Sequence, residues 1–107
     1  MLNELGKEVH DWAIEQGFYD KERNFGETMM LITTEVAEAF EEYRDGRAYD
    51  LNRWENGKVE GIPSELADVI IRVLDTMTYY GIDIDTIVRA KIDYNKTRPH
   101  MNGGKVI

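Results

Sequence analysis

A chain of 107 residues is long enough for one domain, which we place at 1–107, and a domain of this size buries only about two-thirds of the surface that its unfolded chain exposes. The hydrophobic fraction of 42% is too high for a disordered protein, and the net charge of −8 opposes binding to a nucleic-acid polymer, which is itself densely negative. The chain has no cysteine, which excludes disulfides and thiolate catalysis, and it has neither an apolar leader nor a run of 18 apolar residues, so we expect a cytoplasmic protein without a membrane span.

The first half of the chain predicts two helices. Residues 2–16 carry an apolar stripe at helical spacing, and Gly17 is typical of the position just beyond a helix end. Asn24 with Glu27 three positions later is an N-cap and its reciprocal partner, so a second helix should run from there to about Arg44. The apolar arc of this helix consists of Ile32, Val36, Phe40 and Tyr43.

Residues 45–62 have no sustained period and contain three glycines, so we predict a loop, with a short helical turn near 50–54 and no strand. A loop this long is either a solvated excursion with Trp54 against the core or a lid that contacts substrate. The contacts of such a lid would come from Arg47, Arg53, Trp54 and Lys58.

The second half predicts two further helices. Pro63 suits a first helical position, and the helix it begins should end at Tyr80, before Gly81. We expect its buried arc to consist of Leu66, Val69, Ile70, Val73, Met77 and Tyr80. An N-cap signal at 83–85 begins a fourth helix that Pro99 stops at about residue 98. The fold class is therefore all-α, a four-helix bundle.

Carboxylates gather on two of these helices. Glu35, Glu38 and Glu42 recur at i, i+3 and i+7 on the second helix and so share one face. Glu65 and Asp68 stand at i and i+3 on the third. Each pair alone is more often a solvated acidic face, but two pairs beside apolar arcs can face one another in a bundle. An all-oxygen set of this kind favours Mg²⁺, for which Mn²⁺ can substitute.

The fourth helix carries the opposite charge. Lys91, Asn95 and Arg98 fall on one helical face, and Lys105 follows in a glycine-containing tail. Cations with an amide suit phosphate oxygens, whereas the structural alternative is favourable charge near a helix C-terminus. Trp12 and Trp54 lie in segments that could lean over the carboxylates, whereas aromatic residues in a small helical domain are more often core.

These residues together resemble the MazG-like nucleotide pyrophosphohydrolases, an all-α family with the pattern EExxE, a spacer and ExxD. The pattern here reads TEVAE at 34–38 and, after 26 residues, ELAD at 65–68. The Lys91, Asn95, Arg98 and Gly103-Gly104-Lys105 positions resemble the family's C-terminal signature. Thr34 replaces the first glutamate of the pattern, and Asn102 stands where a histidine often precedes Gly-Gly-Lys.

The resemblance implies hydrolysis of a nucleoside triphosphate between its α and β phosphates, with nucleotide-pool house-cleaning as a role. It implies Glu35, Glu38, Glu65 and Asp68 as metal ligands, with Glu38 also catalytic. Glu41 or Glu42 would orient or deprotonate the attacking water, and we favour Glu42 because it lies on the ligand face. Phosphate or ribose would contact Lys91, Asn95, Arg98 and Lys105. The base of the nucleotide would stack on Trp12 or Trp54. It also favours a homodimer or a tetramer built as a dimer of dimers. The alternatives are a non-catalytic helical module that binds a partner and a phosphoribosyl-ATP pyrophosphohydrolase.

Overall fold

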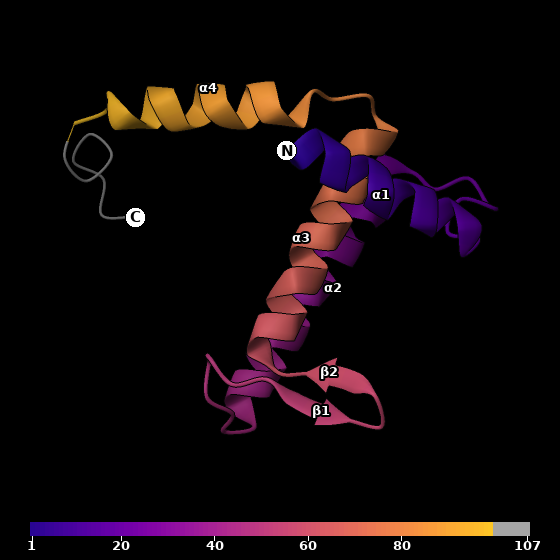
Figure 1. Cartoon of the computed structure of the whole chain (residues 1–107), viewed down its shortest axis with the longest axis vertical. Helices are drawn as coiled ribbons and strands as arrows, with labels where there is room; N and C mark the ends of the chain where they lie inside the picture. Colours follow the sequence, from indigo (N-terminus) through magenta and orange to yellow (C-terminus); the bar gives the residue numbers. More distant parts are fainter. Residues whose placement is uncertain (100–107) are drawn as a thin grey trace.

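The computed structural model describes residues 1–99 and is mostly helical (Figure 1). Four helices and a two-stranded sheet follow one another along the chain. They are α1 (Leu2–Glu15), α2 (Phe25–Arg44), β1 (Arg53–Glu55), β2 (Lys58–Glu60), α3 (Ile62–Tyr79) and α4 (Ile84–Lys96). The four predicted helices are confirmed, with bounds close to those that the sequence indicates.

Local signals fix where these helices begin and end. The Asn24 side chain accepts a hydrogen bond from the Glu27 backbone N–H at 2.8 Å, and its amide donates to Glu27 Oε1 at 3.0 Å. The predicted N-cap of α2 is thereby confirmed. Gly17 follows α1 with a φ of +83°, a conformation that glycine adopts without strain.

Helices α2 and α3 lie side by side and run in opposite directions (Figure 1). Helix α1 crosses α3 near the C-terminal end of α3. Gly6 is buried at this crossing, where a β-carbon would collide with the Thr78 side chain. The small fully apolar core of the described residues consists of Ala13, Ala39, Ile62, Leu74 and Ile84. We call the packed helices α1, α2 and α3 the three-helix body. It fixes the positions of the side chains on α2 and α3.

Helix α4 departs from the predicted four-helix bundle, because it projects away from the body instead of packing along it (Figure 1). The start of α4 is anchored to the start of α1 by hydrogen bonds. The Ile84 backbone N–H donates to Asn3 Oδ1 at 2.7 Å, and the Leu2 backbone N–H donates to Asp85 Oδ1 at 2.7 Å. Beyond this anchor no residue of α4 is buried, so Ile87 and Ile92 remain exposed.

The prediction of a strandless loop between α2 and α3 is wrong, because a β-hairpin lies there. Strand β1 pairs antiparallel with β2, with Trp54 opposite Val59. The two-residue turn consists of Asn56 and Gly57, whose φ angles of +52° and +79° fit a type I′ turn. The helical turn expected near 50–54 is likewise absent, since β1 begins at residue 53.

The apolar arcs of α2 and α3 are not fully covered within one chain. Val36, Phe40 and Tyr43 are 50–64% exposed on α2, and Leu66 and Ile70 are 48% and 57% exposed on α3. Tyr80, the last residue of the predicted buried arc, lies just beyond α3 and is 43% exposed. For Leu66, Ile70 and Tyr80 the prediction of burial is wrong, since no further helix in the described part of the chain covers them. No helix among residues 1–99 is long and apolar enough to cross a membrane.

Candidate metal centre

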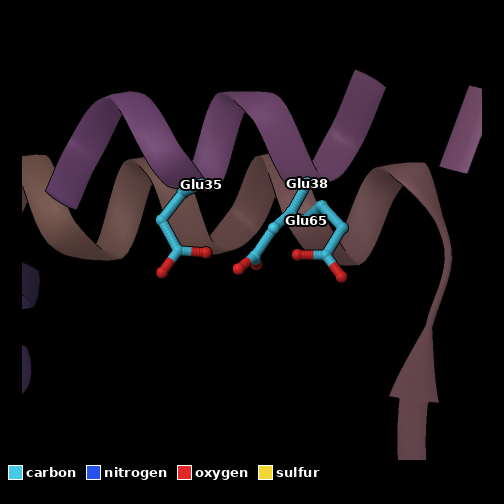
Figure 2. Close-up of side chains that lie close together, drawn as sticks. All are labelled: Glu35, Glu38 and Glu65. Carbon is cyan, nitrogen blue, oxygen red and sulfur yellow. The ribbon is translucent and has the colours of Figure 1, made fainter. Parts of the chain in front are cut away.

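Three of the four predicted metal ligands meet between α2 and α3. Glu35 and Glu38 come from α2 and Glu65 from the first turn of α3, and one oxygen of each lies within 4.8 Å of the others. Figure 2 shows the three side chains extending to the same side of the helix pair. The i, i+3 spacing on α2 and the antiparallel packing of α3 produce this convergence.

A second group of carboxylates shares Glu65 with the first. Oxygens of Glu42 on α2, Glu60 at the end of β2 and Glu65 also lie within 4.8 Å of one another. Glu60 was not predicted as a site residue, because a strand of three residues gives no period from which its direction can be inferred. The hairpin thus brings an additional carboxylate to the helix pair.

Glu65 is the residue common to both groups and the one that most needs a partner. Its Oε2 is buried and has no hydrogen-bond partner among the described residues. Burial, a hydrogen bond with Glu38 and the negative charges of its neighbours raise the pKa of Glu65 to about 7. A hard cation would satisfy this oxygen and offset the repulsion, and the all-oxygen donor set fits Mg²⁺ or Mn²⁺.

Asp68, the fourth predicted ligand, lies beside these groups. Its pKa is raised by burial and by the charge of Glu35, while Arg72 and Lys58 act in the opposite direction. Asp68 and Glu35 both line a cavity of about 160 Å³ between α1, α2 and α3. Two of the four metal ligands predicted from the sequence, Glu35 and Asp68, therefore border a small hollow between the three helices.

Two positively charged side chains lie next to the carboxylates. The Arg72 Nε on α3 donates to Glu35 Oε1 at 2.7 Å, and the Lys58 Nζ on β2 lies 3.2 Å from Glu60 Oε1. Lys58 was predicted as a loop contact, whereas Arg72 was missed. The sequence does hold a signal for Arg72. It lies four residues after Asp68, on the same helical face, and it interrupts an apolar run.

Glu42 lies in a different environment from the one expected of a water-activating residue. Its Oε2 accepts hydrogen bonds from Arg47 Nε at 2.8 Å and from Arg53 Nη1 at 3.2 Å. These arginines, Arg53 first, hold the pKa of Glu42 below its usual range. A carboxylate that is held ionised in this way is a weak proton acceptor, and the contacts tie the hairpin to α2.

Of the two tryptophans, Trp12 lies at the cavity and Trp54 does not. Trp12 on α1 lines the cavity with Glu35 and Asp68, and it also borders an adjoining hollow of about 400 Å³ that Asp68 shares. Its ring packs edge-on against Phe18, with 5.3 Å between the ring centroids. Trp54 is 73% exposed on the hairpin.

A largely buried polar network adjoins the cavity through Asp75. Asp75, which lines it, accepts a hydrogen bond from the Tyr19 hydroxyl at 2.8 Å and contacts His10 Nδ1 at 2.7 Å. This aspartate continues the acidic row of α3 but its two oxygens are already bonded. We therefore assign it to the packing of α1 and the following segment against α3.

Two of the predicted phosphate contacts lie on α4, which projects away from the helix pair that carries the carboxylates. Lys91 and Asn95 lie on the projecting helix α4, Arg98 follows that helix, and none of the three lines the cavity. The Lys91 ammonium instead lies 5.4 Å from the centre of the Tyr94 ring. Lys105 and the glycines before it lie outside the described residues.

Comparison of the chain with protein-family models, with curated proteins and with solved structures found no match. The family resemblance therefore rests on the sequence motif alone.

Proposed function

We propose that this protein is a metal-dependent nucleoside triphosphate pyrophosphohydrolase that releases a nucleoside monophosphate and pyrophosphate. The observation that carries the proposal is the convergence of Glu35, Glu38 and Glu65 around a buried carboxylate oxygen without a hydrogen-bond partner. Solvated acidic faces do not bury such an oxygen, because an unpaired buried polar atom is costly. The motif that these residues belong to adds the reaction class.

The residues take the following roles in the proposal. Glu35, Glu38, Glu65 and Asp68 hold one or two Mg²⁺ ions, which supply charge neutralisation for the phosphates and a more acidic water. Glu38 also accepts the proton of the attacking water. Trp12 offers its exposed ring face to the base, because it borders the same cavity as Glu35 and Asp68.

We include self-association in the proposal because two of the predicted phosphate contacts lie on α4, away from the carboxylates of the same chain. Lys91 and Asn95 belong to α4, which projects away from the helix pair that carries the carboxylates. They can meet the carboxylates of a second copy, to which their charge is complementary. The exposed apolar side chains of α2 and α3, among them Phe40 and Ile70, give that copy a surface to cover.

The reaction is tested by measuring pyrophosphate release from the eight common ribo- and deoxyribonucleoside triphosphates with Mg²⁺. We expect activity with at least one of them and a loss of about 100-fold or more in Glu38→Gln and Asp68→Asn. Glu41, the other candidate for the attacking water, is 59% exposed and pairs with Arg44 at 2.9 Å, so Glu41→Gln should keep the parental rate and serves as the matched control on the same helix. A folded Glu38→Gln protein with the parental rate would overturn the proposal. Adding phosphoribosyl-ATP to the substrates tested distinguishes this reaction from that of the alternative, a phosphoribosyl-ATP pyrophosphohydrolase.

Self-association has its own test. Light scattering at micromolar concentration should report a multiple of the 12.4 kDa chain mass. Phe40→Glu places a charge in the exposed apolar face of α2, where it should shift the protein toward monomer. Glu41→Gln changes the neighbouring position on another face and should leave the assembly unchanged. A parental protein that remains monomeric contradicts this part of the proposal.

A further inference from the structure

One charged contact inside the three-helix body is not assigned a role by the proposed reaction. Arg72 on α3 donates through Nε to Glu35 Oε1 at 2.7 Å. The Glu35 side chain is 11% exposed and the Arg72 side chain 30% exposed, so the pair is largely shielded from water. A carboxylate buried to this degree needs a partner, because its desolvation is otherwise uncompensated.

The contact also limits how Glu35 can orient. A carboxylate accepts through both oxygens, so the guanidinium that holds Oε1 leaves Oε2 for another ligand. Arg72 comes from the same helix as Glu65 and Asp68 and lines the same cavity as Glu35 and Asp68. The Arg72 guanidinium is therefore held among the carboxylates and is not a counter-ion on the protein surface.

We propose that Arg72 is the positioning residue of the metal centre, which holds the Glu35 carboxylate in its ligating orientation before a metal ion arrives. This inference rests on the proposed metal centre, but not on the reaction or on the nucleotide. Arg72 acts through Glu35 and does not touch the ion itself.

Two effects of Arg72 on metal affinity have opposite signs, which makes the inference testable. A fixed positive charge near a cation site weakens binding by Coulomb repulsion, so its removal alone would strengthen binding. A residue that orients a ligand strengthens binding, and loss of such a partner typically weakens metal affinity by about 10–100-fold. Positioning therefore predicts weaker binding in Arg72→Met, even though a positive charge has been removed.

The experiment measures Mn²⁺ affinity by electron paramagnetic resonance of the free ion, without nucleotide. We expect the Kd of Arg72→Met to rise by about 10–100-fold and that of Arg72→Lys to rise less, since lysine keeps the charge without the planar fork. The matched control is Arg89→Met, which removes an arginine paired with Asp93 on α4. That variant should bind Mn²⁺ as the parental protein does.

A double-mutant cycle with Glu35→Gln decides whether Arg72 acts through Glu35. In a Glu35→Gln background the further change Arg72→Met should not raise the Kd, because only the loss of a nearby positive charge remains there. Should Arg72→Met fail to fold, the same comparison is made with Arg72→Lys.

Unchanged or tighter binding by Arg72→Met, or an equal loss in the Glu35→Gln background, would overturn the inference. A parental protein that takes up no Mn²⁺ at millimolar concentration would overturn it too. Mn²⁺ binding that depends on Arg72, in a protein that releases no pyrophosphate, would leave the inference standing and reject only the proposed reaction.

Discussion

Glu38 of α2 and Glu65 of α3 form a carboxyl pair across two helices, with one oxygen of each within 4.8 Å of the other. Burial and the neighbouring Glu38 carboxyl raise the pKa of Glu65 to about 7, so the metal-free site takes up a proton near neutral pH. Both the stability of the protein and its metal affinity should therefore depend on pH.

The stability of the metal-free protein should fall as the pH rises. The pKa of Glu65 is raised from 4.5 to about 7, so between these values the folded state binds more protons than the unfolded state. The stabilisation is present below about pH 4.5 and is lost by about pH 7. After a discount for solvent screening we expect about 1 kcal/mol, or about 4–8 °C in melting temperature.

Thermal melts in a chelator between pH 5 and 8 measure this loss. Glu65→Gln removes the titrating group and should flatten the profile over that range. Glu41→Gln, which changes an exposed acid of α2, should keep the parental slope. An equally steep profile in Glu65→Gln would reject the assignment of the proton to Glu65.

Metal affinity should change in the opposite direction. The metal takes the ionised carboxylate, so binding below about pH 7 has to release the proton of Glu65. We expect the apparent affinity for Mn²⁺ to fall by about tenfold per pH unit below that point and to level off above it. Titrations at pH 6, 7 and 8 test this, and an affinity that is constant over this range would contradict it.

The helices could be predicted from the sequence because their signals are local. Asn24 with Glu27, Gly17 and Pro63 each act within one turn of chain, and the structure places helix ends at or next to them. The direction of α4 could not be predicted in this way. Its apolar residues, such as Ile87, indicate a covered face, but no local signal states which surface covers it.

The hairpin could have been found and was not. Asn56-Gly57 is a strong signal for a two-residue turn, but strands of three residues are too short to show alternation. For the site, helical spacing predicted that Glu35 and Glu38 share a face. It did not predict Arg72 as the partner of Glu35, because that contact depends on the rotation of α3 against α2.

Trp12 should contribute to nucleotide binding more than Trp54 does. Trp12 borders the cavity that Glu35 and Asp68 line, whereas Trp54 is exposed on the hairpin. Loss of an aromatic contact of this kind is worth about 0.5–1.5 kcal/mol, so Trp12→Ala should raise KM by about 3–10-fold with little change in kcat. Steady-state kinetics with Mg²⁺ measure both constants.

Two variants complete the comparison. Trp12→Phe keeps an aromatic ring and should recover most of the affinity. Trp54→Ala should behave as the parental protein. A larger rise in KM for Trp54→Ala than for Trp12→Ala would assign the base contact to the hairpin instead.

Glu42 should matter for the hairpin more than for the chemistry. It is paired with Arg47 and Arg53, and its lowered pKa makes it a weak base. Glu42→Gln should therefore lower kcat far less than Glu38→Gln, while it increases amide hydrogen exchange in β1 and β2. Arg53→Met should reproduce the exchange effect from the other side of the ion pair. A loss of kcat in Glu42→Gln as large as that in Glu38→Gln would restore Glu42 as the base.

The backbone at Gly61 should be essential to the site because it connects β2 to α3. Gly61 has a φ of +126°, and a β-carbon there would collide with the carbonyl oxygen of Leu51. Its own carbonyl accepts the Glu65 backbone N–H at 3.0 Å, so a shift at Gly61 moves the first turn of α3. Gly61→Ala should cost about 2 kcal/mol or more and weaken Mn²⁺ binding.

Gly57→Ala is the matched control for this change. Gly57 also has a positive φ, of +79°, but a β-carbon there meets no atom within 4 Å. Gly57→Ala should thus cost only the strain of the turn, about 1 kcal/mol, and leave the Mn²⁺ affinity unchanged. Denaturant unfolding and Mn²⁺ titration of both variants make the comparison. Equal losses in the two variants would show that strain at a positive φ, and not the contact between Gly61 and Leu51, accounts for the effect.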